Sequence, residues 1–188
     1  MATISNRTYP MTIVESIVTR HFRLSADDNE LYEQAKRCVC NAFDTAEDYT
    51  NRIIVACDAT FALGEAEGGV LRLPTAPVKS VTEVRYLASN GEWHTLDTKD
   101  YELVGDIRSA ELELLTPISA TRFRVNAECG FDDYADEADK SEYALPGAIE
   151  QAVALMAQTF LDGEALSGAT ELAAHNMLNP WRIYPYGD

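Results

Sequence analysis

Five carboxylates are crowded into one short stretch of the chain, and clustered carboxylates bind hard cations such as Mg²⁺ or Ca²⁺. They are Asp132, Asp133, Asp136, Glu137 and Asp139. A metal-dependent enzyme is therefore one hypothesis for this chain. The stretch lacks the glycine and the ligand spacing of an EF-hand loop, and runs of charge usually lie in water. We expect an exposed loop over residues 131–143 without a bound metal.

No other set of residues has the spacing of a catalytic site. The three histidines fall in a predicted helix end, a strand and a terminal helix, at positions 21, 94 and 175. None is matched with a nucleophile and an orienting acid, and no phosphate-binding glycine motif is present. The four cysteines lack the C-x-x-C spacing of zinc or redox sites, so we expect them to be reduced and partly buried. We predict a non-enzymatic protein without cofactors.

The last residues of the chain are rich in aromatic side chains and can bind a partner. Aromatic residues and arginine dominate the energetics of protein interfaces. A second interpretation packs the same residues on the body of the protein as a C-terminal clamp, and the sequence leaves both open. The residues concerned are Trp181, Arg182, Ile183, Tyr184 and Tyr186.

The charge of the chain disfavours a surface that grips nucleic acid. Its 188 residues include 31 acidic and 15 basic side chains, which give a formal net charge of -16 and a pI near 4.4. Such a surface repels phosphates. The sequence shows no signal-peptide pattern and no apolar run of membrane-spanning length. We therefore expect a cytoplasmically made chain that neither enters a membrane nor binds duplex DNA tightly.

The stretch from Leu71 to Tyr101 organises the middle of the chain. Pro74 and Pro77 predict an edge or a crossover, because proline cannot donate to a central ladder. A half-buried strand around Val84 follows, and Asn90-Gly91 predicts a type I′ hairpin turn. With short alternating segments on both sides, we predict an antiparallel β-module of five or six strands over residues 53–130.

Helical patterns flank this module. Residues 11–22 and 25–49 show apolar residues at helical spacing, with a capping box at Thr12 and Glu15, a start signal at Ser25 and an end at Asn51. After the acidic loop, a nearly all-round apolar helix spans residues 148–160, which must be covered by its own chain or by neighbouring subunits. A short helix over residues 170–178 follows it.

These elements predict an α+β protein, in which N- and C-terminal helices form a helical bundle with the antiparallel β-module inserted. The predicted divisions are N-terminal helices in 1–52, the β-module in 53–130, and the acidic loop, C-terminal helices and aromatic tail in 131–188. The helical parts are expected to pack as one domain.

The order of motifs in the β-module resembles the head-tail connector, or head-completion adaptor, proteins of tailed bacteriophages. The motifs are LRLP from Leu71, P-V-x-S-V-x-x-V-x-Y from Pro77, the Asn90-Gly91 turn, G-E-W-x-T-L and D-Y-E-L, with helices before and after. The resemblance spans about Thr12 to Tyr184. The N-terminal extension and the long acidic loop depart from the pattern.

The resemblance implies a structural virion protein that assembles in the host cytoplasm. Twelve copies would form a ring beneath the portal, extend the DNA channel and present a surface to the tail or stopper protein. By location, the C-terminal segment would contact the portal. The ring should let duplex DNA slide, so we expect an acidic channel lining to which the carboxylates of the acidic loop contribute. A tail-completion or tube-terminator protein of the same virion is the alternative.

Overall fold

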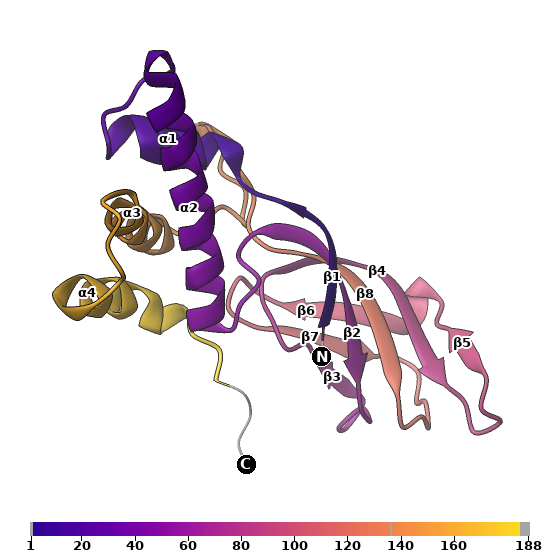
Figure 1. Cartoon of the computed structure of the whole chain (residues 1–188). Coiled ribbons are helices and arrows are strands. Elements are labelled where there is room, and N and C mark those ends of the chain that lie inside the picture. Colours follow the sequence, from indigo (N-terminus) through magenta and orange to yellow (C-terminus); the bar gives the residue numbers. More distant parts are fainter. Residues whose placement is uncertain (1, 136, 185–188) are drawn as a thin grey trace. The chain divides into compact units, whose positions relative to one another are not determined.

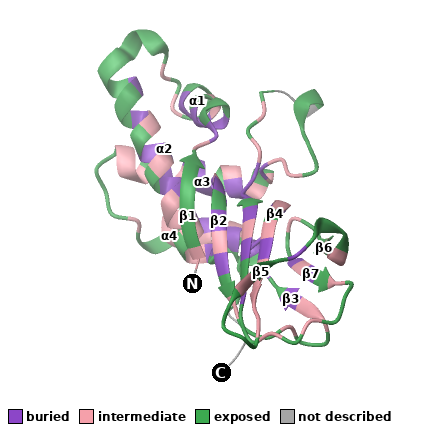
Figure 2. Cartoon of the chain, turned by 90° about the vertical axis from the view of Figure 1, so that its right-hand side faces the viewer, coloured by how far each residue is buried: buried purple, intermediate pink, exposed green. Residues whose placement is uncertain are grey.

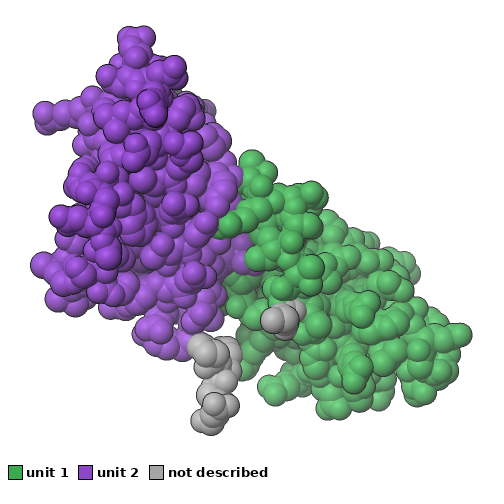
Figure 3. Space-filling view, viewed as in Figure 1, with its two compact units in different colours: residues 1–8, 56–130 green, residues 9–55, 131–188 purple. Residues whose placement is uncertain are grey.

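The computed structural model describes residues 2–135 and 137–184, which divide into two compact units (Figures 1 and 3). The β unit contains residues 2–8 and 56–130, and the helical unit contains residues 9–55 and 131–184. The chain therefore passes from one unit to the other three times. Helices and antiparallel strands occur together, which confirms the α+β class. None of the described helices is long and apolar enough to cross a membrane.

Four α-helices make up the body of the helical unit. They are α1 (Met11–Arg20), α2 (Asn29–Thr50), α3 (Gly147–Leu161) and α4 (Gly168–Leu178). Short 3-10 turns occupy Ala26–Asp28, Glu137–Asp139 and Asn179–Trp181. The helices predicted from periodicity are thus present, with boundaries that differ by a few residues.

The long helix α2 begins and ends where the sequence predicts. The Ser25 amide donates to the Asp28 carboxylate at 2.9 Å, which opens the 3-10 turn before the helix. Asn51 ends the helix in the left-handed conformation, with φ of 53°. The apolar spacing within residues 25–49 predicts that Leu31 belongs to the buried face, but Leu31 is 45% exposed, whereas its neighbour Tyr32 is buried.

The apolar helix α3 is covered largely by its own unit. It packs against both α2 and α4, and Ile149, Val153 and Met156 are inaccessible to solvent. Only a minority of its apolar residues, such as Leu155, stay half-exposed. The apolar character of α3 therefore has an explanation within the chain and does not by itself require a neighbouring subunit.

The β unit consists of two antiparallel sheets. The larger has the order β1 (Ala2–Thr8), β2 (Ala56–Leu63), β8 (Phe123–Cys129), β4 (Val78–Leu87), β5 (Trp93–Thr95). The smaller has the order β3 (Val70–Arg72), β7 (Ala110–Leu114), β6 (Tyr101–Gly105). Figures 1 and 2 show the smaller sheet as a second layer beside the larger one, and Figure 2 shows buried residues in both sheets. The buried residues include Phe61, Val84, Phe123 and Val125 from the larger sheet and Leu71 and Leu112 from the smaller.

Two predicted boundaries of the β-module are wrong. Residues 2–8 do not belong with the N-terminal helices, because they form edge strand β1, which pairs with β2. Six of its seven residues are exposed, so no apolar alternation marked it as a strand. At the other boundary, residues 53–55 lie in the helical unit, where the amides of Ile54 and Val55 donate to the Glu47 carboxylate at 2.7 and 2.8 Å.

The predicted hairpin between β4 and β5 is present, although its turn differs from the expected type. Leu87 pairs with Trp93 across the two strands, and the Gly91 amide donates to the Ala88 carbonyl at 2.9 Å. Gly91 has a φ of 84°, whereas Asn90 does not take a positive φ. The loop is therefore longer than a two-residue type I′ turn. The predicted crossover at Pro74 and Pro77 is confirmed, because this segment leads from β3 in one sheet to β4 in the other.

We predict that Gly105→Ala destabilises the β unit by about 3 kcal/mol. Gly105 ends β6 with a φ of 144°, and a Cβ there would overlap the Ser109 carbonyl oxygen and lie 3.0 Å from Ala110 Cα. The matched control is Gly64→Ala, because no atom lies within 4 Å of a Cβ at Gly64. Urea unfolding should show a change below about 0.5 kcal/mol for the control. Equal stability of the two variants would contradict the prediction.

Candidate interaction surfaces

The acidic loop caps the first helix of the helical unit. The two carboxylate oxygens of Asp133 accept hydrogen bonds from the amides of Thr12 at 2.8 Å and Ile13 at 3.0 Å. These amides lack partners within the helix, and a negative charge there also suits the helix dipole. The predicted capping box of Thr12 and Glu15 is therefore wrong, since the cap residue is Pro10 and Asp133 supplies the acceptor from far along the chain.

Other residues of the loop are also bound into the helical unit. Asp132 accepts from the Ser141 hydroxyl at 2.6 Å, and its amide donates to the Tyr143 carbonyl at 2.9 Å. The Tyr134 hydroxyl donates to the Glu150 carboxylate at 3.2 Å in the first turn of α3. Most described residues of the segment 131–143 are exposed, as predicted, and these hydrogen bonds also fix the segment to the helical unit.

The remaining carboxylates of the loop differ in what the structure describes. Asp139 is exposed at the end of a 3-10 turn. Asp136 and the side chain of Glu137 lie outside the described part of the chain. Within that part, no group of histidine, cysteine or carboxylate side chains has the arrangement of a metal site.

The cysteines form no disulfide. Cys38, Cys57 and Cys129 are buried, whereas Cys40 is half-buried. Burial raises the pKa of the Cys129 thiol to about 12, so this thiol stays protonated at neutral pH. A protonated, buried thiol is a poor nucleophile.

The first part of the C-terminal segment is packed into the helical unit. Trp181 is only 8% exposed, and its ring meets the Phe131 ring edge-on with 6.5 Å between centroids. Arg52 donates from Nε to the Trp181 carbonyl. The Ile183 amide donates to the Thr50 carbonyl at 2.8 Å. Trp181 and Ile183 thus hold the chain against the end of α2, as the clamp interpretation expects.

The following side chains of the segment are available to a partner. Arg182 is exposed and lies over the rings of Tyr49 and Tyr184, at 5.0 and 5.2 Å from their centroids. Tyr184 is 65% exposed. Tyr49 in turn stacks on His175 with 3.7 Å between centroids. Tyr186 lies outside the described residues. The segment therefore divides into buried Trp181, half-buried Ile183 and an exposed pair, Arg182 and Tyr184.

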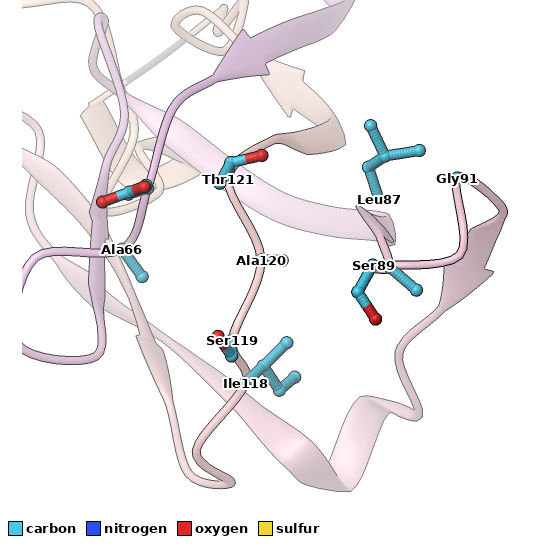
Figure 4. A pocket seen from close by; sticks show the side chains of 10 residues that line it. Ala66, Leu87, Ser89, Gly91, Ile118, Ser119, Ala120 and Thr121 are labelled. Atoms are coloured by element: carbon cyan, nitrogen blue, oxygen red, sulfur yellow. The ribbon is translucent and has the colours of Figure 1, made fainter.

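A shallow hollow of about 600 Å³ lies where three loops of the β unit meet (Figure 4). Its walls come from the loops after β2, β4 and β7, and most of the lining side chains are small. Glu65 is its sole ionisable side chain. Its other polar side chains are the hydroxyl groups of Ser89, Ser119 and Thr121, and neither histidine nor cysteine lines it.

Comparisons with known proteins find similarity in structure rather than in sequence. No protein-family model matches the chain, and no curated protein matches it. Among solved structures, a chain in the neck of an empty gene transfer agent particle, computed with C6 symmetry, is 24% identical with a TM-score of 0.73. The match covers 100% of this chain and 98% of that one. The two chains share one fold.

Two further structures agree with this match. A chain in the virion of the native gene transfer agent particle is 23% identical, with a TM-score of 0.73 and coverage of 100% of this chain and 98% of that chain. A chain in the neck of the native particle, computed with C12 symmetry, is 22% identical with a TM-score of 0.66 and coverage of 99% and 98%. The first two matches cover the whole chain, including the N-terminal strand and the acidic loop.

We predict that Asp133→Ala lowers the free energy of unfolding by about 1–2 kcal/mol, because it leaves two helix amides without their acceptor. Asp139→Ala is the matched control from the same loop, and it should change stability by less than about 0.5 kcal/mol. Chemical unfolding followed by circular dichroism gives both values. If the two variants were equally stable, the capping role of Asp133 would be refuted.

We predict that only the buried part of the C-terminal segment contributes to the free energy of unfolding. Trp181→Ala should cost about 3–5 kcal/mol, because it empties a buried aromatic site. Tyr184→Ala should cost less than about 0.5 kcal/mol, since its side chain is exposed. Thermal and urea unfolding of the two variants test this difference. A larger loss of stability for Tyr184→Ala than for Trp181→Ala would contradict the assignment.

Proposed function

We propose that this chain is a structural protein in the neck of a phage-like particle, where it acts as a head-tail adaptor without catalysis. The observation that carries the proposal is the match over its full length to chains in the neck of gene transfer agent particles. The motif order from Leu71 to Leu103, which resembles head-tail connectors, supports the same role independently of the fold.

In this role the chain forms a ring of twelve copies beneath the portal and presents its other side to the tail or stopper protein. The C12 symmetry with which one matching neck was computed supports the number. A ring of chains with a formal charge of -16 each lets duplex DNA pass without holding it. The carboxylates of the acidic loop add to this field, with Asp139 exposed and Asp133 retained at the helix cap.

The exposed end of the C-terminal segment is the proposed portal contact. Arg182 and Tyr184 combine a guanidinium group with an aromatic ring, which is the composition of interface hot spots. Trp181 and Ile183 contribute by holding this pair in place, because their packing and hydrogen bonding fix the segment to α2.

Mixing the purified protein with portal rings and, separately, with tail tubes of the same particle tests the role. Negative-stain images should show an added ring on portals and none on bare tail tubes. Binding to tail tubes alone would instead identify a tail-completion or tube-terminator protein. Arg182→Ala combined with Tyr184→Ala should abolish portal binding, whereas Leu172→Ala, which removes another exposed apolar side chain of the helical unit, should not.

A further inference from the structure

Two arginines face each other in the middle of the larger sheet of this acidic protein. Arg85 on β4 and Arg124 on β8 are direct partners in the antiparallel register. Like charges directly opposite one another destabilise a sheet. The pair therefore lowers the stability of the larger sheet, so its presence suggests a role other than stabilising the fold.

This pair forms no ion pair within the described part of the chain, although Glu83 lies two residues before Arg85 on the same face, where the Asn126 side chain donates to it at 3.0 Å. Within the described part of the chain, none of Arg85, Arg122 and Arg124 forms an ion pair, and the buried Nε of Arg85 has no hydrogen-bond acceptor. The Arg124 guanidinium lies 4.6 Å from the centroid of the Trp93 ring, which positions it. Positioned guanidinium groups without an acceptor are suited to binding carboxylates or phosphates from another molecule.

The smaller sheet carries the opposite arrangement. Glu102 on β6 and Glu113 on β7 are direct partners in the register, and both are exposed. Neither forms an ion pair within the described residues, because the nearby Arg72 is bound to Glu111 at 3.4 Å. A second like-charge pair, now negative, therefore lies in the same β unit.

The two pairs lie on opposite outer faces of the β unit. Val84 and Val125, which neighbour the arginines in sequence, are fully buried, so alternation turns the arginines to the other face of the larger sheet. Leu112, next to Glu113, is likewise buried, and the glutamates face outward from the smaller sheet. One face thus carries the two arginines beside Glu83, and the other carries the two glutamates beside the ion pair of Arg72 and Glu111.

We propose that the arginine pair of one copy binds the Glu102 and Glu113 pair of the next copy, and that this contact joins neighbouring subunits of the ring. Direct cross-strand partners have Cβ atoms about 4.5–5.5 Å apart in any antiparallel pair. The Cβ atoms of the two pairs therefore have matching spacing, and two contacts between a guanidinium and a carboxylate are compatible with the register. A contact between two different faces is heterologous, and heterologous contacts generate a closed ring when the rotation from copy to copy closes.

The charge of the whole chain favours this occupant over nucleic acid. The whole chain has a formal net charge of -16, so it repels a long polyanion such as DNA even though two arginines lie together on one face. A pair of carboxylates on another copy reaches only the arginines. Its binding gives each arginine and each glutamate an opposite charge, and so reduces the repulsion within both pairs. The inference rests on the proposed ring, and its test is chosen to separate the two.

The test uses two charge-reversed variants of the full chain. One carries Arg85→Glu with Arg124→Glu, and the other carries Glu102→Arg with Glu113→Arg. Each alone should associate with itself at least about a hundredfold more weakly than the natural chain, because like charges then face each other across the contact. An equimolar mixture should assemble again, since alternating copies restore opposite charges at every contact.

Sedimentation velocity at low ionic strength measures the association, and circular dichroism verifies that each variant folds. The matched control is Arg20→Glu with Arg37→Glu, which changes net charge equally on exposed residues of the helical unit and should assemble normally. Restoration in the mixture requires both variants to be folded, so it also excludes misfolding as the cause of the loss.

Each outcome decides a different question. If the natural chain and both variants form rings equally well, this contact is refuted while the adaptor role stands. If the natural chain forms no ring, alone or on portals, the adaptor role fails and the contact fails with it. If the arginine variant loses only affinity for duplex DNA in a gel shift, and the mixture restores nothing, the arginines are a nucleic-acid site and the proposal is overturned.

Discussion

The helical unit depends on joining two segments of chain that the whole β-module separates in sequence. Residues 9–55 supply α1 and α2, and residues 131–184 supply α3, α4 and the C-terminal segment. Packing of α3 against α2 forms the apolar contact between these two segments. Hydrogen bonds join the two segments at two further places. Asp133 accepts from the start of α1, and the backbone of Trp181 and Ile183 is bonded at the end of α2.

Because of these long-range contacts, some residues that the sequence suggests as binding residues stabilise the fold instead. A cluster of carboxylates in the sequence suggests a cation site, yet two of its members, Asp133 and Asp132, accept hydrogen bonds from other parts of the helical unit. An aromatic tail reads as a binding surface, yet its tryptophan completes a core. Of the described residues of this segment, Arg182 and Tyr184 stay exposed.

Sequence reasoning predicted elements whose signals are local. The periodicity of α2 and α3, the left-handed end at Asn51 and the alternation around Val125 each follow from neighbouring residues, and the structure confirms them. Reasoning of this kind failed where the partner was distant. Strand β1 has almost no buried side chain to reveal it, and the cap of α1 comes from a residue more than a hundred positions away. The charged pairs of the two sheets were invisible until strand register placed their members opposite each other.

Because the chain passes between the units three times, the direction of synthesis determines which unit is completed first. A segment cannot pair with residues that the ribosome has not yet made, and domains generally fold as units during translation. All strands of the β unit exist once Cys129 has been added, although β1 must wait for β2. The helical unit lacks α3, α4 and its C-terminal hydrogen bonds until Ile183 has been added. The middle of this protein is therefore ready to fold first, while α1 and α2 remain on the growing chain as helices without their core.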